Sequence, residues 1–204
     1  MPDWHAMSTL IERRHQETRA RIADIAVSLF LEHGFDETTM DDVADEAGVS
    51  RRTVYRHFLS KDELVFENPR RWLEHFEREI SRRQPGESIH DLCCRGVMSV
   101  AQLIEDNAPS VLSAYTVYST TPSLRGRNGK AEDDWFERYL ALLTPDEVPD
   151  RAAMLQIVAV AGSLVGTTKA LVAVWAFTQP DADMVAMTET TLDQLDPIWP
   201  DWLR

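Results

Sequence analysis

The chain has little cysteine. Its two cysteines among 204 residues, Cys93 and Cys94, are adjacent. Neighbouring cysteines are poorly placed to bond each other and no second pair exists, so the sequence excludes a disulfide framework and fits a reducing cytoplasm. It also lacks a glycine-rich phosphate loop and a recognisable set of nucleophile, base and orienting residue. We therefore expect neither enzyme activity nor a cofactor. The N-terminus has no apolar run behind a basic start, so we expect no secretory signal.

Positive charge is also scarce. Lysine and arginine number 21 against 34 aspartate and glutamate residues, which gives a net charge of −13. Neither the part before residue 66 nor the part after it is basic overall, so strong nonspecific attraction to polyanions is not expected. The early basic residues are unevenly placed, however. Several of them follow directly after an acidic stretch: Arg51, Arg52, Arg56 and Lys61. A focused site fits this placement better than a broad basic surface.

Alternation of apolar and polar residues, the pattern of a half-buried strand, is missing as well. Apolar residues recur instead at helical spacing in one segment after another, which predicts an all-α protein. We expect two domains, residues 1–66, with a tail at 1–10, and residues 67–204. A first helix would begin near Thr9, where a capping motif precedes the apolar pattern. The length is sufficient for a small and a larger domain with a substantial core.

The most informative segment runs from Gly34 to Leu64. Thr39 can cap a short helix and Gly48 can end it in the left-handed conformation. Ser50 can cap a second helix that reaches Phe58. The apolar residues of the first helix recur at helical spacing: Met40, Val43, Ala44 and Ala47. Two short helices joined by such a turn are typical of a helix-turn-helix.

The second of these helices leaves basic and hydroxyl side chains for its outer surface. Arginine can pair with guanine edges, while threonine and tyrosine can reach phosphates or thymine methyl groups. A capping box at 60–63 would place free amides and the Lys61 ammonium where a phosphate could sit. The candidate DNA-contacting residues are Thr39, Ser50, Arg51, Arg52, Thr53, Tyr55, Arg56, His57 and Lys61.

The same segment resembles the signature of TetR-type transcriptional regulators. The similarity covers about a third of the chain, from Thr18 to Phe66, and one departure is Arg52, where the family often has glycine. The matching residues are Gly34-Phe35, Thr38-Thr39-Met40, Val43-Ala44, Ala47-Gly48-Val49-Ser50, Thr53-Val54-Tyr55, His57-Phe58 and Ser60-Lys61-Asp62-Glu63-Leu64. The resemblance implies an N-terminal three-helix DNA-binding domain followed by a helical effector-binding and dimerisation domain. It also implies that Thr39, Tyr55, His57 and Lys61 contact phosphates, while Arg51, Arg52 and Thr53 face bases.

A long segment, residues 152–177, is apolar on nearly every side. Its length would allow a membrane crossing, but polar residues interrupt it, and Lys169 lies near its middle. We expect a helix buried between its own domain and a second copy of the chain, which would let a two-fold dimer read an inverted repeat in double-stranded DNA. The candidate interface residues, which include a stripe on the final helix, are Ala159, Gly162, Gly166, Met184, Thr188, Leu192 and Leu195.

The second domain is rich in aromatic and sulfur-containing side chains. By resemblance to the family, such a domain holds a small, largely apolar effector, and the run from Thr121 to Tyr139 is similar to the branch with acyl-CoA-like ligand domains. Tyr115 and Tyr118 would make polar contacts. The candidate pocket residues are Trp72, Phe76, Cys93, Val97, Met98, Tyr115, Tyr118, Trp135, Tyr139 and Met154.

An alternative function is a di-iron or redox protein. Glu12 and His15, and likewise Glu87 and His90, form Glu-x-x-His pairs of the kind that helical di-iron bundles use. Both pairs lie in opening turns rather than on apolar mid-helix faces. We therefore expect no metal site and a transcriptional regulator, most simply a repressor.

Overall fold

The computed structural model describes residues 4–124, 129–145, 150–178 and 183–204. Within these ranges all regular secondary structure is helical, which confirms the predicted all-α class. The chain divides into two compact units. The first joins the residues up to Asn68 with a segment that begins at Leu112, and the second holds Pro69–Val111 and the chain from Gly129 onward.

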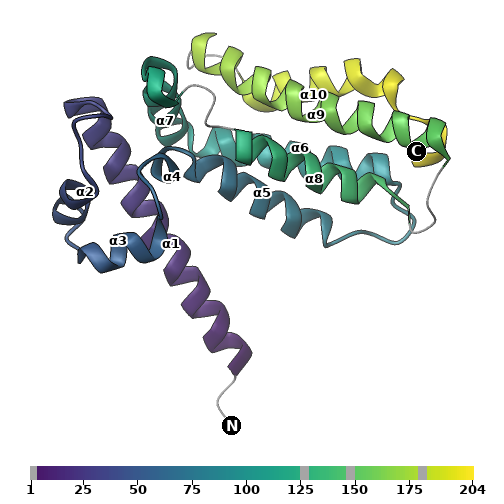
Figure 1. Ribbon diagram of the computed structural model, residues 1–204. Coiled ribbons are helices and arrows are strands. Elements are labelled where there is room, and N and C mark those ends of the chain that lie inside the picture. The colour runs from purple at the N-terminus through teal and green to yellow at the C-terminus, as the bar shows by residue number, and fades with distance from the viewer. Residues whose placement is uncertain (1–3, 125–128, 146–149, 179–182) are drawn as a thin grey trace. The chain divides into compact units, whose positions relative to one another are not determined.

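The first unit is built around a long helix, with short helices lying against it (Figure 1). The elements are α1 (Trp4–His33), α2 (Met40–Glu46), α3 (Arg51–His57), α4 (Asp62–Val65), α7 from Leu112 on (Ala108–Thr120) and the 3₁₀ turn η1 (Pro122–Leu124). Helix α1 begins at Trp4, so the expected start near Thr9 was wrong. A capping motif favours a helix start but does not stop an upstream segment from continuing the same helix.

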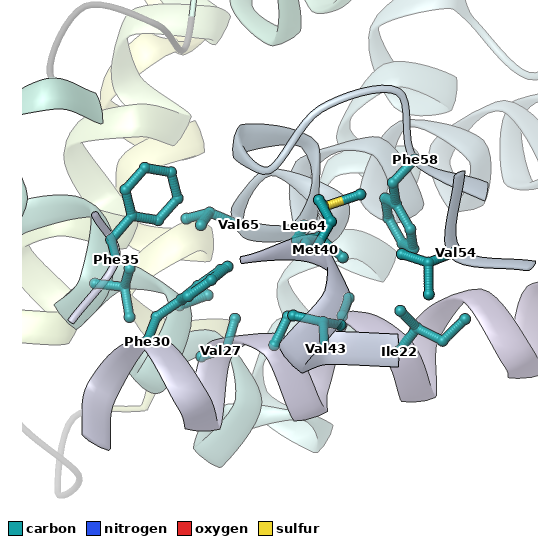
Figure 2. Close-up of a cluster of buried hydrophobic side chains, with 14 of the residues drawn as sticks. Ile22, Val27, Phe30, Phe35, Met40, Val43, Val54, Phe58, Leu64 and Val65 are labelled. Carbon is teal, nitrogen blue, oxygen red and sulfur yellow. The ribbon is translucent and has the colours of Figure 1, made fainter. Parts of the chain in front are cut away.

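The core of the first unit consists of apolar side chains from each of these helices. Figure 2 shows Ile22, Val27 and Phe30 of α1 facing Val43 of α2 and Val54 of α3. Phe58 and Leu64 close the same cluster and are almost fully buried. Burying a side chain of this size contributes about 1.5–3 kcal/mol, so the short helices, unstable alone, are held in place by packing.

The second unit is a bundle in which α9 lies along both α8 and α10 (Figure 1). Its elements are α5 from Pro69 on (Glu67–Ile80), α6 (Ile89–Asp106), α8 (Gly129–Leu143), α9 (Arg151–Thr178), α10 (Met184–Leu195) and the 3₁₀ turns η2 (Asp196–Ile198) and η3 (Asp201–Leu203). Gly96 of α6 meets Phe76 of α5 closely: a Cβ on Gly96 would lie 2.5 Å from the Phe76 Cε2 atom. Glycine therefore sets the distance between these helices.

Helix α9 is long and apolar enough to cross a membrane by length and composition. Its sides differ, however. Ile157, Val160 and Leu164 are buried within the unit, whereas Leu155 and Phe177 are 62% and 75% exposed. Lys169 pairs with Glu132 of α8 at 2.7 Å. The apolar character of α9 therefore belongs partly to the core and partly to an open surface.

Candidate DNA-binding face and effector cavity

Hydrogen bonds at both helix starts fix the turn between α2 and α3. The Thr39 hydroxyl accepts the amide of Asp42 at 3.1 Å, and the Asp42 carboxylate accepts the Thr39 amide and hydroxyl. These bonds from Thr39 lower the pKa of Asp42. Ser50 caps α3 by accepting the Thr53 amide at 3.1 Å. Gly48 adopts φ +64° between the helices, the left-handed conformation that glycine tolerates at least cost.

Four side chains of α3 point outward: Arg51, Arg52, Tyr55 and Arg56. We call these four residues the reading face. Val54, on the opposite side of the helix, is fully buried. Thr53 is half-buried, and Thr39 and Ser50 are exposed but bonded within the turn as described. The geometry presents three guanidinium groups and a phenol, the donors suited to base edges and phosphates.

His57 does not join the reading face, contrary to the outward orientation expected from sequence. It is 4% exposed, its ring lies 4.1 Å from that of His15 between centroids, and neither ring nitrogen has a hydrogen-bond partner among the residues that the structure describes. Burial, reinforced by the nearby charges of His15, Arg56 and Arg19, lowers the pKa of His57 to about 4. The imidazole is therefore neutral and covered at physiological pH.

The Lys61 side chain has a structural role in the first unit. Its ammonium donates to the backbone carbonyl oxygens of Phe35, Asp36 and Thr38, and it lies 4.4 Å from the centroid of the Phe35 ring. These acceptors use all three of its N–H donors. The predicted capping box at 60–63 is also absent at α4, whose N-cap is Lys61 without a side-chain bond. The carboxylate of Glu63 instead accepts the Leu59 amide at 2.9 Å.

A second contact ties α1 to the start of α5 within the first unit. Arg19 pairs with Glu67 at 2.7 Å, and the Glu67 side chain is 3% exposed. The Arg19 guanidinium also lies 4.1 Å from the centroid of the Phe58 ring. The sequence pattern gave no sign of this pair, because its residues are far apart in the chain and neither belongs to a recognised motif.

In the second unit, a cavity of about 10 Å³ lies between α6, α8, α9 and α10. Three of the predicted pocket residues, Val97, Trp135 and Tyr139, line it. The Tyr139 hydroxyl bonds with Thr168, and burial raises the pKa of this phenol well above its usual range. The lining residues that the sequence analysis did not assign to the pocket are Val100, Ala101, Ile104, Thr168, Leu171, Met184 and Thr188. A threonine in a strongly apolar helix, as at Thr168, was the available signal.

The other predicted pocket residues lie elsewhere. Trp72, Phe76 and Cys93 are buried, and Met98 and Met154 are half-buried, but none of these lines the cavity. Tyr115 and Tyr118 belong to the first unit, where the ring of Tyr118 packs against that of Phe66 at 5.9 Å between centroids. At the cavity itself, the tyrosine that makes a polar contact is Tyr139.

Of the predicted interface residues, some are exposed and others are buried. Ala159, Gly162 and Gly166 are exposed on α9, as a contact surface requires. Met184 and Thr188, 2% exposed each, point into the bundle, so their assignment to an interface was wrong. The reason is that α10 packs this stripe against α6. Leu192 and Leu195 are half-buried.

The candidate metal and redox residues are occupied by other partners. Glu87 forms an ion pair with Arg95 at 2.8 Å, which lowers the pKa of Glu87 to about 2, while His90 faces Asp91 and Asp196. The Glu12 side chain lies outside the described residues. In the described part of the chain, no cluster of three or more His, Cys, Asp or Glu side chains is arranged to hold a metal ion.

The cysteines are not activated thiols. Burial raises the pKa of Cys93. The pKa of Cys94 is raised to about 11, mainly by burial and to a smaller extent by the negative charge of Asp91. Because the thiolate is the nucleophile, both groups stay protonated and unreactive at neutral pH.

Comparison with known proteins agrees with this geometry. Residues 22–67 match the family of bacterial regulatory proteins described as the tetR family. The HTH-type transcriptional regulator HbdR of Aromatoleum sp. (strain CIB) is 33% identical over 116 residues, 56% of this chain and 47% of HbdR. AcrR of Shigella flexneri is 31% identical over 86 residues, 41% of this chain and 40% of AcrR. The chain thus spans less than half the length of these relatives.

Solved structures extend the likeness to the whole fold. FadR from Bacillus subtilis in complex with stearoyl-CoA has a TM-score of 0.59 at 19% identity, covering 86% of this chain and 96% of FadR. The TetR regulator TylP from Streptomyces fradiae has a TM-score of 0.60 at 21% identity, covering 87% of this chain and 85% of TylP. The capped helix-turn-helix at residues 22–67 is that of the tetR family of bacterial regulatory proteins, and the solved structures share the fold of the chain as a whole.

Proposed function

We propose that this chain is a sequence-specific DNA-binding transcriptional regulator that acts in the cytoplasm as a homodimer. In this proposal it represses its target until a small, largely apolar effector releases it. The observation that carries the proposal is the reading face: Arg51, Arg52, Tyr55 and Arg56 are exposed on a helix whose other side is locked into a core. An α-helix of this kind fits the major groove of B-DNA.

Dimerisation is supported by the open side of α9. One reading head contacts few base pairs, and a two-fold pair would read an inverted repeat. The exposed stripe combines large apolar residues at its ends with small ones at its centre, which would let two helices approach closely. Its members are Leu155, Val158, Ala159, Gly162, Gly166, Val174 and Phe177. Leu192 and Leu195 of α10 remain candidate neighbours in this interface.

The cavity supports an effector that is mostly apolar, with Tyr139 and Thr168 as its polar group. The FadR structures from Bacillus subtilis and Thermus thermophilus hold stearoyl-CoA and lauroyl-CoA. We therefore propose acyl chains as the first effector class to test. An effector can release DNA only if it binds the releasing conformation more tightly than the DNA-binding one.

Selection of bound duplexes from a random DNA pool tests the regulator itself. The purified chain, at moderate salt, should enrich an inverted repeat, since two related heads contact equivalent half-sites. Failure to enrich any sequence would contradict sequence-specific binding. Acyl-CoA esters of increasing chain length would then be added to the protein–operator complex. Release by one length range but not by coenzyme A alone would support the effector class.

The reading face gives a sharper prediction for Arg52. If Arg52 pairs with a guanine, Arg52→Ala should weaken operator binding by about 1–3 kcal/mol and relax the preference at one base of each half-site. Arg21→Ala, which removes an exposed arginine of α1, serves as the control. Equal losses on operator and random duplexes for Arg52→Ala would refute its base-reading role.

A further inference from the structure

The exposed arginines of α3 are not equivalent. Arg51 is paired across the turn with Asp41 of α2: its guanidinium Nη2 atom lies 2.8 Å from the Asp41 Oδ2 atom. Arg52 and Arg56 form no ion pair with any residue that the structure describes. The arginine at the start of the recognition helix is therefore tethered, whereas its neighbours are free to follow any phosphate within reach.

The Asp41 carboxylate has two effects on Arg51. Arg51 is the first residue of α3, at the positive end of the helix, where a cation is disfavoured, and the carboxylate offsets this repulsion. It also holds a long side chain that is 68% exposed, so less rotamer freedom remains to be lost when the guanidinium meets a base edge.

The same carboxylate opposes indiscriminate binding. Asp41 is itself 38% exposed beside the reading face, where it repels phosphate oxygens. If Arg51 leaves Asp41 to contact a phosphate in the wrong register, it loses its partner and leaves an unpaired negative charge near the backbone. The two consequences favour a guanine in register over a random phosphate.

From this geometry we infer that Asp41 is a specificity-determining residue of the reading face, acting through Arg51. The inference rests on the proposed DNA-binding function. Without the Asp41 carboxylate, Arg51 becomes another freely moving cation. This raises the affinity for random duplexes and weakens the preference for one base in each half-site. Since an exposed ion pair changes an equilibrium by about two- to fivefold, the ratio of operator to random affinity should fall by that factor.

The test compares Asp41→Asn with Asp45→Asn, which removes the same charge from the same helix at an exposed position that does not pair with Arg51. Affinities for operator and random duplexes are measured by fluorescence anisotropy. Asp45→Asn should strengthen both equally, whereas Asp41→Asn should strengthen random binding more and lower the ratio. Asp41→Glu should restore it. Equal ratios for the two asparagine variants would reduce Asp41 to a general surface charge and overturn the inference.

An Arg51→Gln background tests the route of the effect. In that background Asp41→Asn should no longer change the ratio, and a persisting change would overturn the role of Arg51. Selection from a random pool separates this inference from the proposed function. A wild-type chain that selects no sequence would overturn both. A wild-type chain that selects an inverted repeat, while Asp41→Asn retains every base preference, would overturn the inference alone.

Discussion

At the scale of single residues, the surface of the DNA-binding unit could be predicted better than its interior. The outward direction of Arg51, Arg52, Tyr55 and Arg56 follows from helical spacing once the apolar side of α3 is known. Spacing does not reveal that His15 of α1 covers His57, because that contact depends on the packing of a distant helix. Nor does it reveal the carbonyl groups that surround the Lys61 ammonium.

The buried His57 makes stability pH-dependent. Its pKa is lowered from 6.5 to about 4, so below pH 6.5 the unfolded chain binds a proton that the folded chain rejects. The contribution of neutral His57 to the free energy of unfolding is therefore fully present above pH 6.5 and is lost as the pH falls towards 4. We expect the free energy of unfolding to drop by about 2 kcal/mol more between pH 7 and pH 5 in the wild type than in His57→Gln.

Urea unfolding at the two pH values measures this difference. His33→Gln is the control, because the His33 side chain is 56% exposed. If the pH dependence of His57→Gln equals that of the wild type, the titration of His57 does not control stability.

Lys61 should behave as a structural residue. Lys61→Met keeps an apolar stem over Phe35 but removes the donors to the carbonyl groups, which should cost about 1–3 kcal/mol in the free energy of unfolding. Lys130→Met, at an exposed position, should leave stability unchanged. Unchanged stability of Lys61→Met together with uniformly weaker DNA binding would instead identify a phosphate ligand.

At the scale of elements, the capping residues Thr39 and Ser50 marked the starts of α2 and α3 correctly, whereas α1 begins upstream of the motif at Thr9 and α4 begins without a side-chain cap. Ser50, predicted as a cap, begins α3 by accepting the amide of Thr53, and Ser88 begins α6 in the same way by accepting the amide of Asp91 at 3.0 Å. The start of α1 was missed since no breaker precedes Thr9. Helix α7 was not anticipated as an element, because Pro109 in its first turn reads as an interruption although proline is compatible with that position.

The close approach of α5 and α6 gives a prediction for this scale. Gly96→Ala should destabilise the protein by about 1–3 kcal/mol, because the new Cβ would overlap the fully buried Phe76 ring. Gly162→Ala has open space around it and should gain up to about 1 kcal/mol from helix propensity. Both are measured by urea unfolding in a Val158→Asp background, so that contacts between copies do not contribute. Equal effects would contradict a packing role for Gly96.

At the scale of the whole molecule, the proposed dimer would form through the exposed stripe of α9. Val158 is 41% exposed in the single chain, so Val158→Asp should fold normally. In a dimer the carboxylate would be buried without a partner, at a cost of about 3–5 kcal/mol, which weakens association at least about 100-fold. Sedimentation equilibrium measures the change, with Gln102→Asp on the exposed side of α6 as control. An unchanged dimer would place the interface elsewhere.

The size of the cavity also affects the rate at which an effector can bind. A space of about 10 Å³ holds at most one water molecule, so an effector cannot enter while the surrounding side chains are packed. Binding at this place requires a prior opening, and its rate then levels off as effector concentration rises instead of increasing in proportion. If the opening is slower than the rise and fall of the effector, the proposed regulator would respond to a signal that persists and not to one that is brief.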